Sequence, residues 1–301
     1  MWHSRPRLRD SSAMNICHNL SRLVLAATAA LLMCSGLRAQ VKDVLAKPAI
    51  HTEYFAHPDD AKKRIEVFWA KPATQTPSPA IVFLHGHQEP ERPGARVYVD
   101  MGTLEQMAAA GYVAIAISQP GYGGSDGPPD FCGPYTQHAV LRVIREFRKR
   151  ALVRPNEMAV QGVSRGANVA AMVAAQDDKL AAVILVAGLY DLGKLFAMAE
   201  RSPLVKRIVD NVRSETHGAD EQVIRERSAL LFADRIKAAT LILNGAQDDR
   251  TDPEVARQLG AKIAAHGTPA EVVIYPDYGH SIPPPERAKV IAPFLARYLK
   301  P

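Results

Sequence analysis

A serine between two glycines is the first candidate for chemistry in this sequence. Residues 162–166 read GVSRG and fit the pattern Gly-x-Ser-x-Gly, with Ser164 at the centre. In that pattern the serine lies on a sharp turn between a strand and a helix and acts as a nucleophile. A serine hydroxyl attacks only when a base takes its proton and a carboxylate orients that base. Because a match arises by chance in about one chain in twenty, the surrounding sequence must supply both partners.

Two later segments offer the acid and the base. Residues 246–253, AQDDRTDP, follow an apolar run and contain Asp248 and Asp249, either of which is a candidate acid. Residues 277–283, DYGHSIP, follow a second apolar run and contain His280. Serine, then acid, then histidine is the chain order of α/β-hydrolases.

The elements that must position these residues are predicted from apolar runs. Continuous apolar runs indicate strands buried on both faces, and an alternating run indicates a half-exposed strand. Helical patterns lie between them, the clearest at 135–151, whose basic face we interpret as solvated, and another beginning at the N-cap Asp252 and ending before Gly267. This alternation predicts an α/β fold with a mainly parallel central sheet and helices on both faces. The predicted strands are 64–70, 80–85, 112–118, 158–162, 181–188, 239–245 and 270–275.

Ser164 falls between the predicted strand 158–162 and a predicted helix over 167–176, so the turn has the context that a nucleophile needs. From about residue 81 to 299 the chain resembles the catalytic domain of the prolyl oligopeptidase family within the α/β-hydrolases, and related dienelactone-hydrolase-like esterases. The segments FADRIKAATLILNGAQDDRTDP (232–253) and VVIYPDYGHS (272–281) carry this resemblance. It implies Asp248 as the acid, paired with His280.

The oxyanion hole requires two backbone N–H donors near the nucleophile. Arg165, directly after Ser164, supplies one, and the resemblance implies His87 as the other. The chain departs from the family pattern at Asn244, Ala167 and Ser281, which bears on substrate and subfamily and touches no triad residue.

We therefore predict a serine hydrolase that cleaves a carboxylic ester through an acyl-enzyme, acting on a small ester or a short peptide, with no cofactor. A peptidase acting on short peptides or acylated amino acids is one alternative, and a non-catalytic binding scaffold is another. The larger peptidases carry an N-terminal propeller where this chain has only about 40 residues, which favours the esterase. Residues 193–237 interrupt the alternation and are predicted to form a small helical cap insertion that determines specificity.

Several other residues have two interpretations. His85 and His87 form a His-x-His pair of the kind that binds zinc, but no third ligand is evident, so we predict no metal site. Tyr122 either faces substrate or packs, Asp191 has a structural or rim position, and Cys132 is a small buried residue or lies at the rim of the site.

Residues 1–39 have the pattern of a secretory signal peptide, with Met14 as a possible alternative start and cleavage expected after Ala39. An uncleaved membrane anchor and a lipoprotein processed at Cys34 are the alternatives. Without this segment 32 basic and 30 acidic residues remain, so the formal net charge falls from +6 to +2 and gives no reason to expect nucleic-acid binding. We expect residues 40–301 to form one secreted or periplasmic domain with no stable membrane association.

Overall fold

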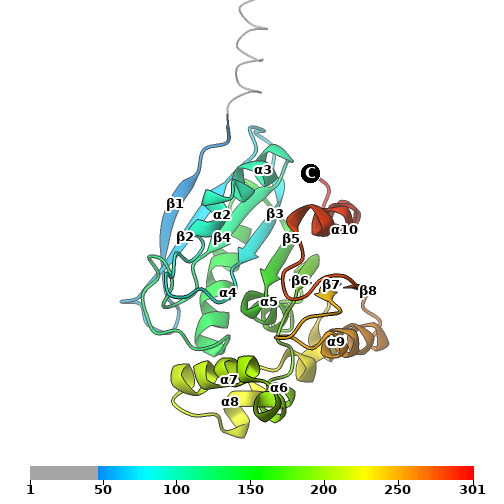
Figure 1. Cartoon of the computed structure of the whole chain (residues 1–301). Helices are drawn as coiled ribbons and strands as arrows, with labels where there is room; N and C mark the ends of the chain where they lie inside the picture. Colours follow the sequence, from blue (N-terminus) through cyan, green and yellow to red (C-terminus); the bar gives the residue numbers. More distant parts are fainter. Residues whose placement is uncertain (1–46) are drawn as a thin grey trace, which may run out of the picture. The chain divides into compact units, whose positions relative to one another are not determined.

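An eight-stranded sheet runs through the part of the chain that the computed structural model describes, residues 47–301 (Figure 1). The predicted signal peptide lies outside these residues, and residues 48–301 form one compact unit. The strands are β1 (His51–Ala56), β2 (Arg64–Ala70), β3 (Ser78–Leu84), β4 (Val113–Ile117), β5 (Val153–Val163), β6 (Ala182–Val186), β7 (Ala239–Gly245) and β8 (Ala270–Tyr275).

The sheet has the order β1-β2-β4-β3-β5-β6-β7-β8. The pairs β1–β2 and β2–β4 are antiparallel, and every pair from β4 to β8 is parallel. The predicted mainly parallel α/β-hydrolase fold is therefore confirmed. Parallel strands place all their carboxyl ends at one edge, so loops that follow β5, β7 and β8 meet there.

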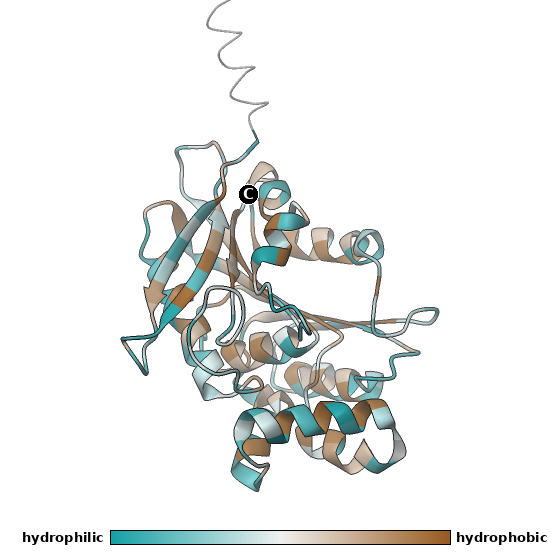
Figure 2. Cartoon of the chain, turned by 60° about the vertical axis from the view of Figure 1, so that its left-hand side comes forward, coloured by the Kyte–Doolittle hydropathy of each residue, from teal (hydrophilic) through white to brown (hydrophobic). Residues whose placement is uncertain are grey.

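Helices cover both faces of the sheet and form two buried apolar clusters with it. One face carries α2 (Arg96–Asp100), α3 (Thr103–Ala109) and α10 (Pro284–Tyr298). The other face carries α4 (Pro134–Arg148), α5 (Arg165–Ala174) and α9 (Pro253–Ala265). Because β3, β4, β6 and β7 are buried on both faces, they read as continuous apolar runs, and Figure 2 shows the inner strands as largely hydrophobic.

The two helices predicted with the most detail are confirmed. Helix α4 buries six apolar residues, and its arginines on the other side are largely engaged in ion pairs such as Arg148 with Asp177. Helix α9 begins at the N-cap Asp252, whose side chain accepts a hydrogen bond from the Glu254 N–H at 2.8 Å. The buried apolar residues of α4 are Ala139, Val140, Leu141, Val143, Ile144 and Phe147.

Strand β1 was not predicted from the sequence. It pairs antiparallel with β2 at the edge of the sheet, and its residues are exposed or half-buried. An edge strand with little burial on either face has no continuous apolar run to indicate it. The sheet was otherwise predictable, apart from the residues before Met158 by which β5 is longer than expected.

The segment between β6 and β7 contains α6 (Leu192–Met198), η1 (Ala199–Arg201), α7 (Pro203–Thr216), α8 (Glu221–Arg225) and η2 (Ala229–Arg235). The segment 193–237, predicted to form a cap insertion, thus contains several helices, of which the 14-residue α7 is the longest. Helix α7 buries Val205, Val209 and Val212 on one side, as its apolar spacing dictates. Within residues 47–301 none of the helices has the length and apolar character that a membrane crossing requires.

Candidate active site

Ser164 lies on the turn between β5 and α5 and has a positive φ of 54° with ψ of −120°. Such a backbone conformation is strained for a residue with a side chain and occurs where the surrounding structure imposes it. The flanking glycines are required by close approach of the backbone. A Cβ atom on Gly162 would overlap the carbonyl of Gly166, and one on Gly166 would overlap the carbonyl oxygens of Leu84 and His85. The turn therefore presents the serine hydroxyl beyond the carboxyl end of β5.

His280 and Asp248 lie next to this hydroxyl, although 116 residues separate Ser164 from His280. The Oγ of Ser164 is 3.0 Å from Nε2 of His280, and Nδ1 of His280 is 3.0 Å from Oδ2 of Asp248. When the Nδ1–H of the neutral imidazole donates to the Asp248 carboxylate, Nε2 carries no proton and accepts a hydrogen bond from the serine hydroxyl. Loops after β5, β7 and β8 thus bring nucleophile, acid and base into one hydrogen-bonded chain.

The carboxylate of Asp248 is fully buried and held by donors of its own loop. The N–H groups of Arg250 and Thr251 each donate to Oδ1 at 2.9 Å, and the Thr251 hydroxyl donates to Oδ2. Burial alone would raise the pKa of Asp248, but hydrogen bonds and charge from His280, with those from Thr251, lower it below its ordinary value. The group is therefore held as a carboxylate aimed at the imidazole.

The alternative acid, Asp249, lies elsewhere. Its side chain is largely exposed and its nearest charged partner is Arg250, at 3.9 Å. The structure therefore places Asp248, and not Asp249, against His280. The role of Thr251 was missed, although a hydroxyl three residues after an aspartate in a loop is a common local hydrogen-bond partner.

The two predicted oxyanion donors lie on either side of Ser164. Arg165 follows it at the start of α5, and His87 lies one residue beyond Gly86, where a Cβ would come within 3.2 Å of the Ser164 Cβ. Among the described residues, neither the Arg165 N–H nor the His87 N–H donates to a protein acceptor. Both remain available to a ligand atom bound beside the serine hydroxyl.

The side chain of Arg165 connects the nucleophile turn to the helical insertion. Its guanidinium donates to Oε1 of Glu215 on α7 at 2.7 Å and to the Tyr122 hydroxyl at 2.8 Å. Burial works against this charge, but the carboxylate of Glu215, together with Tyr122 and Cys132, outweighs it, so the pKa of Arg165 is raised. Tyr122 also lies 3.2 Å from Nδ1 of His87, so one hydroxyl links both oxyanion residues. Glu215 was missed because no local pattern relates it to residues 50 positions away.

In the pair His85-x-His87, His85 takes part in hydrogen bonds within the protein. His85 is buried, its Nε2 accepts from the N–H of Gln119 at 3.1 Å, and its Nδ1 lies 2.8 Å from the Gly86 carbonyl oxygen. Burial lowers its pKa to about 4, so the ring is neutral at physiological pH. No group of three or more metal-ligating side chains occurs among residues 47–301.

The two remaining sequence candidates have structural contacts. The Cys132 thiol is buried and donates to the Arg165 carbonyl oxygen at 3.3 Å, and burial raises its pKa to about 12. Such a thiol stays protonated and unreactive. Asp191 caps α6 by accepting from the Lys194 N–H at 3.0 Å.

A cavity of about 880 Å³ opens above Ser164 and His280. Its lining comes from α2, α3 and α10 on one side and from α7 of the insertion on the other. Apolar side chains such as Val97, Met107 and Ile291 lie among polar and charged groups in the lining, a mixture that suits a small organic ligand with polar substituents. Arg287 of α10 is among the polar groups and was not predicted from the sequence.

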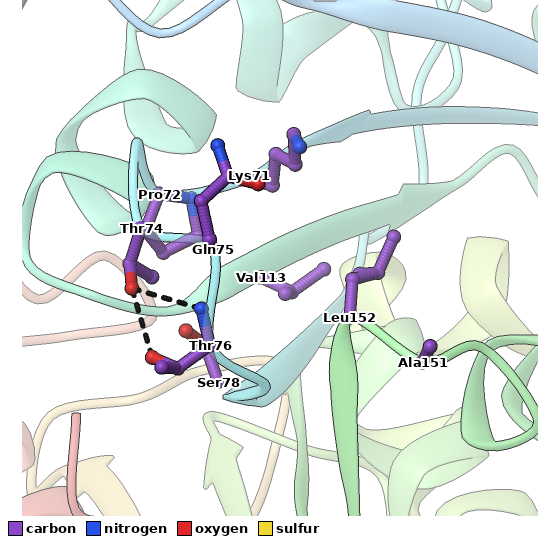
Figure 3. A pocket seen from close by; sticks show the side chains of 9 residues that line it. All are labelled: Lys71, Pro72, Thr74, Gln75, Thr76, Ser78, Val113, Ala151 and Leu152. Atoms are coloured by element: carbon purple, nitrogen blue, oxygen red, sulfur yellow. Dashed lines mark hydrogen bonds between the residues drawn. The ribbon is translucent and has the colours of Figure 1, made fainter.

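A smaller hollow of about 200 Å³ lies at the opposite ends of the strands (Figure 3). Ser78 and Val113, the first residues of β3 and β4, line it, and Thr74 accepts a hydrogen bond from the Thr76 N–H at 3.1 Å. Its lining contains no histidine, cysteine or carboxylate. The lining residues are Lys71, Pro72, Thr74, Gln75, Thr76, Ser78, Val113, Ala151 and Leu152.

Comparison with known proteins gives a consistent result. The profile of the prolyl oligopeptidase family matches residues 129–300. The chain is 23% identical over 191 residues to the uncharacterized peptidase YtmA of Bacillus subtilis, covering 63% of this chain and 73% of that protein. It spans only 12%, 30% and 34% of three longer curated relatives, all named as dipeptidyl or aminopeptidases.

Solved structures share the fold at lower identity. Acetyl xylan esterase from Paenibacillus sp. R4 superposes with a TM-score of 0.65 at 22% identity, covering 85% of each chain. Acylaminoacyl peptidase from Pyrococcus horikoshii superposes with a TM-score of 0.69 at 18% identity, covering 87% of this chain and 44% of that one. Esterases and peptidases therefore both occur on this fold, and the resemblance inferred from the acid loop is confirmed.

Proposed function

This chain belongs to the prolyl oligopeptidase family and is a serine hydrolase, and we propose that it cleaves carboxylic esters with Ser164 as nucleophile. The observation that carries this proposal is the hydrogen-bonded chain from Ser164 through His280 to Asp248 at the floor of the cavity. No other histidine of the described residues lies within hydrogen-bond distance of the Ser164 hydroxyl.

In the proposed reaction His280 takes the Ser164 proton while the serine oxygen attacks the ester carbonyl. The tetrahedral oxyanion accepts hydrogen bonds from the N–H groups of His87 and Arg165. His280 then gives its proton to the departing alcohol, which leaves an acyl-enzyme on Ser164. Water, deprotonated by the same histidine, hydrolyses the acyl-enzyme to a carboxylic acid and restores the serine. Asp248 orients the imidazole and stabilises its charged form throughout.

The cavity favours an ester over the amino-terminal peptide of an aminopeptidase. Binding a free amino terminus requires an available carboxylate, because an ammonium group is costly to desolvate without one. The cavity lining has two carboxylates, and both are already paired: Glu89 with Arg92 at 2.7 Å and Asp210 with Lys206 at 2.7 Å. A neutral or anionic substrate is the better match to this lining.

Labelling by a fluorophosphonate tests the proposal on the purified chain. We expect one label, mapped by peptide mass to Ser164, that is lost in Ser164→Ala and in His280→Ala. Ser281→Ala is the matched control, since this neighbouring serine is exposed and should leave labelling unchanged. Absence of label on folded wild-type protein would refute an activated serine and favour a binding scaffold.

The esterase and peptidase proposals differ in their substrates. We expect p-nitrophenyl esters of short acids to be hydrolysed with kcat/KM well above that for aminoacyl, prolyl or acylaminoacyl p-nitroanilides. Faster cleavage of the anilides would identify a peptidase with the same nucleophile.

Export to the periplasm or the medium is also proposed, on the signal-like sequence of residues 1–39 alone. Expression of the full chain in a bacterial host, followed by N-terminal sequencing of the exported protein, tests it. A start at Gln40 is expected, and full-length protein retained in the cell would contradict it.

A further inference from the structure

One part of the active-site cavity combines an apolar wall with polar groups that have no protein partner. This part, which we call the α10 lobe, is defined by Tyr98 of α2, Gln161 of β5 and Arg287 of α10. Gln161 is two residues before Val163 on β5 and points to the same face of the sheet, the one that α2, α3 and α10 cover. The lobe therefore lies beside the nucleophile turn, on the side away from the α4–α5 layer.

Arg287 is the feature of the lobe that most needs an explanation. Its Nε atom is buried and has no hydrogen-bond partner, and among residues 47–301 no carboxylate pairs with its guanidinium. Its neighbour Glu286 is held instead by Lys289, at 2.7 Å. Burial lowers the pKa of Arg287, which shows that the surroundings work against its charge. Burying a guanidinium without a partner costs free energy, and a ligand carboxylate that accepts two hydrogen bonds from it would offset that cost.

The two other polar groups suit the same ligand. Tyr98 is almost fully buried, and the charge of Arg287 acts directly on its hydroxyl. Neither the Tyr98 hydroxyl nor the Gln161 carboxamide hydrogen-bonds to a side chain or backbone group of the described residues. A hydroxyl, an amide and a guanidinium together offer several donors to one planar, anionic acceptor.

The cavity as a whole, like Arg287 itself, carries a net positive charge. Its two carboxylates are neutralised by cations, as described above, and Arg165 is neutralised by Glu215. Arg250 pairs with Asp249 at 3.9 Å, whereas Arg207 remains at the exposed mouth and Arg287 remains inside. A substrate that enters this cavity meets net positive charge.

We propose that Arg287 binds a carboxylate of the substrate, so that the enzyme prefers esters that also carry an ionised carboxyl group. This inference rests on the proposed ester hydrolysis and names the substrate class of the same site. The guanidinium binds the carboxylate through two parallel hydrogen bonds, assisted by Tyr98 and Gln161, while the ester carbonyl lies against Ser164. Arg287 is a specificity residue and takes no part in proton transfer.

Matched ester pairs test this preference. One pair carries the charge on the acyl side, the mono-p-nitrophenyl ester of adipic acid against p-nitrophenyl hexanoate. The other carries it on the leaving group, 4-carboxyphenyl acetate against 4-methylphenyl acetate. In wild type we expect a higher kcat/KM for the anionic member of one pair, and the pair concerned identifies the side that the lobe holds.

Arg287→Met removes the cation but keeps an unbranched apolar side chain of similar reach. We expect it to lower kcat/KM for the preferred anionic ester by about 10- to 100-fold, mainly through KM, and for its neutral partner by less than about threefold. Arg297→Met is the matched control. It removes the same charge from the same helix, but Arg297 is exposed and pairs with Glu271 at 2.6 Å outside the cavity. Equal losses in both variants would indicate long-range attraction only and overturn the assignment.

A binding measurement separates this inference from the proposed reaction. Adipate and 4-hydroxybenzoate are products of the two anionic esters, and we expect one of them to bind Ser164→Ala in calorimetry and not to bind Ser164→Ala with Arg287→Met. Hydrolysis of neutral esters without any anionic preference or product binding would refute the role of Arg287 alone. Product binding without hydrolysis of any ester would refute the proposed reaction and retain the anion site.

Discussion

Glu215→Gln should destabilise this protein far more than an ordinary loss of a surface ion pair. Arg165 and Glu215 are only 3% and 9% exposed, and their closest atoms are 2.7 Å apart. The substitution removes the charge that balances a buried guanidinium. In the wild type, Oε2 accepts a hydrogen bond from the Phe131 N–H at 2.9 Å and Oε1 accepts one from Arg165. In the glutamine variant one of these two oxygens becomes an NH₂ group, which cannot accept that hydrogen bond.

The expected loss in the free energy of unfolding follows from the burial of the ion pair between Arg165 and Glu215. Removing one partner of a buried ion pair costs about 3–5 kcal/mol, because the other charge stays buried without compensation. The aromatic ring of Phe131, 4.2 Å below the guanidinium, and the Tyr122 hydroxyl remain in place, so we expect the lower end, about 3 kcal/mol. For a domain of this size that corresponds to a fall in Tm of about 6–12 °C.

Asp210→Asn on the same helix is the matched control. Asp210 pairs with Lys206 at 2.7 Å, but these side chains are 46% and 63% exposed, and such pairs contribute about 0.3–0.5 kcal/mol. Urea unfolding followed by far-ultraviolet circular dichroism gives the free energy of unfolding of each variant. We also expect Glu215→Gln to reduce kcat by about tenfold, since loss of a complete oxyanion donor costs about 10²- to 10³-fold and here the Arg165 N–H is only displaced.

The double variant Arg165→Met with Glu215→Leu distinguishes a lost attraction from an uncompensated charge. Replacing both charges by apolar groups of similar volume should recover more than half of the stability that Glu215→Gln loses. A Glu215→Gln protein no less stable than Asp210→Asn would refute the reasoning from burial. Failure of the double variant to recover would mean that packing around the pair, and not its charge, decides the stability.

Three further predictions follow from the site. Asp248→Asn should lower kcat by about 10³-fold or more while Asp249→Asn lowers it less than threefold, because only Asp248 orients the imidazole; equal effects in steady-state assays would disprove the assignment. His85 has an ordinary pKa of 6.5 and a folded pKa of about 4, so between these values the unfolded chain binds a proton that the folded chain does not. The contribution of His85 to stability is therefore complete above pH 6.5 and is lost as the pH falls towards 4, by about 3 kcal/mol in all. In urea unfolding, the free energy of unfolding of His85→Asn should fall by about 2 kcal/mol less than that of the wild type between pH 7 and pH 5. Gly162→Ala should abolish activity and lower Tm by many degrees because its Cβ overlaps the Gly166 carbonyl. Gly193→Ala, whose Cβ would come no closer than 3.3 Å to any neighbouring atom, should leave kcat/KM unchanged; an active, stable Gly162→Ala protein would contradict this view of the turn.

Ser164, Asp248 and His280 share one property that the sequence shows: each lies in the loop or turn that follows an apolar run. Ser164, Asp248 and His280 come after β5, β7 and β8, and an apolar run of strand length indicates a strand in the sequence even where, as in β8, the strand is only half-buried. Once the strands are known to be parallel, their carboxyl ends must lie together, so the site follows from topology alone. The acid loop added the family resemblance that selected Asp248 over Asp249.

The residues that escaped prediction are held by tertiary contacts. Glu215 lies on α7, where an acidic residue in an amphipathic helix is indistinguishable from any solvated glutamate, and Arg287 lies on α10 in the same way. Only the folded chain shows that Glu215 is buried against Arg165 and that Arg287 is half-buried, with a buried Nε that has no partner among the described residues. Strand β1 escaped for the opposite reason, since it has too little burial to leave a pattern.

Arg165 combines a role that the sequence predicts with a contact that only the structure shows. Its backbone N–H belongs to the nucleophile turn and is available beside Ser164, while its side chain holds α7 of the insertion through Glu215. The same insertion lines the cavity opposite α10, so the element that shapes the substrate site is fastened to the residue that is proposed to stabilise the oxyanion. Any displacement of α7 must either break the buried ion pair, which costs about 3 kcal/mol or more, or move Arg165 with it. Substitutions in α7 that alter substrate preference should therefore change kcat as well as KM, even where their own side chains never reach the ester.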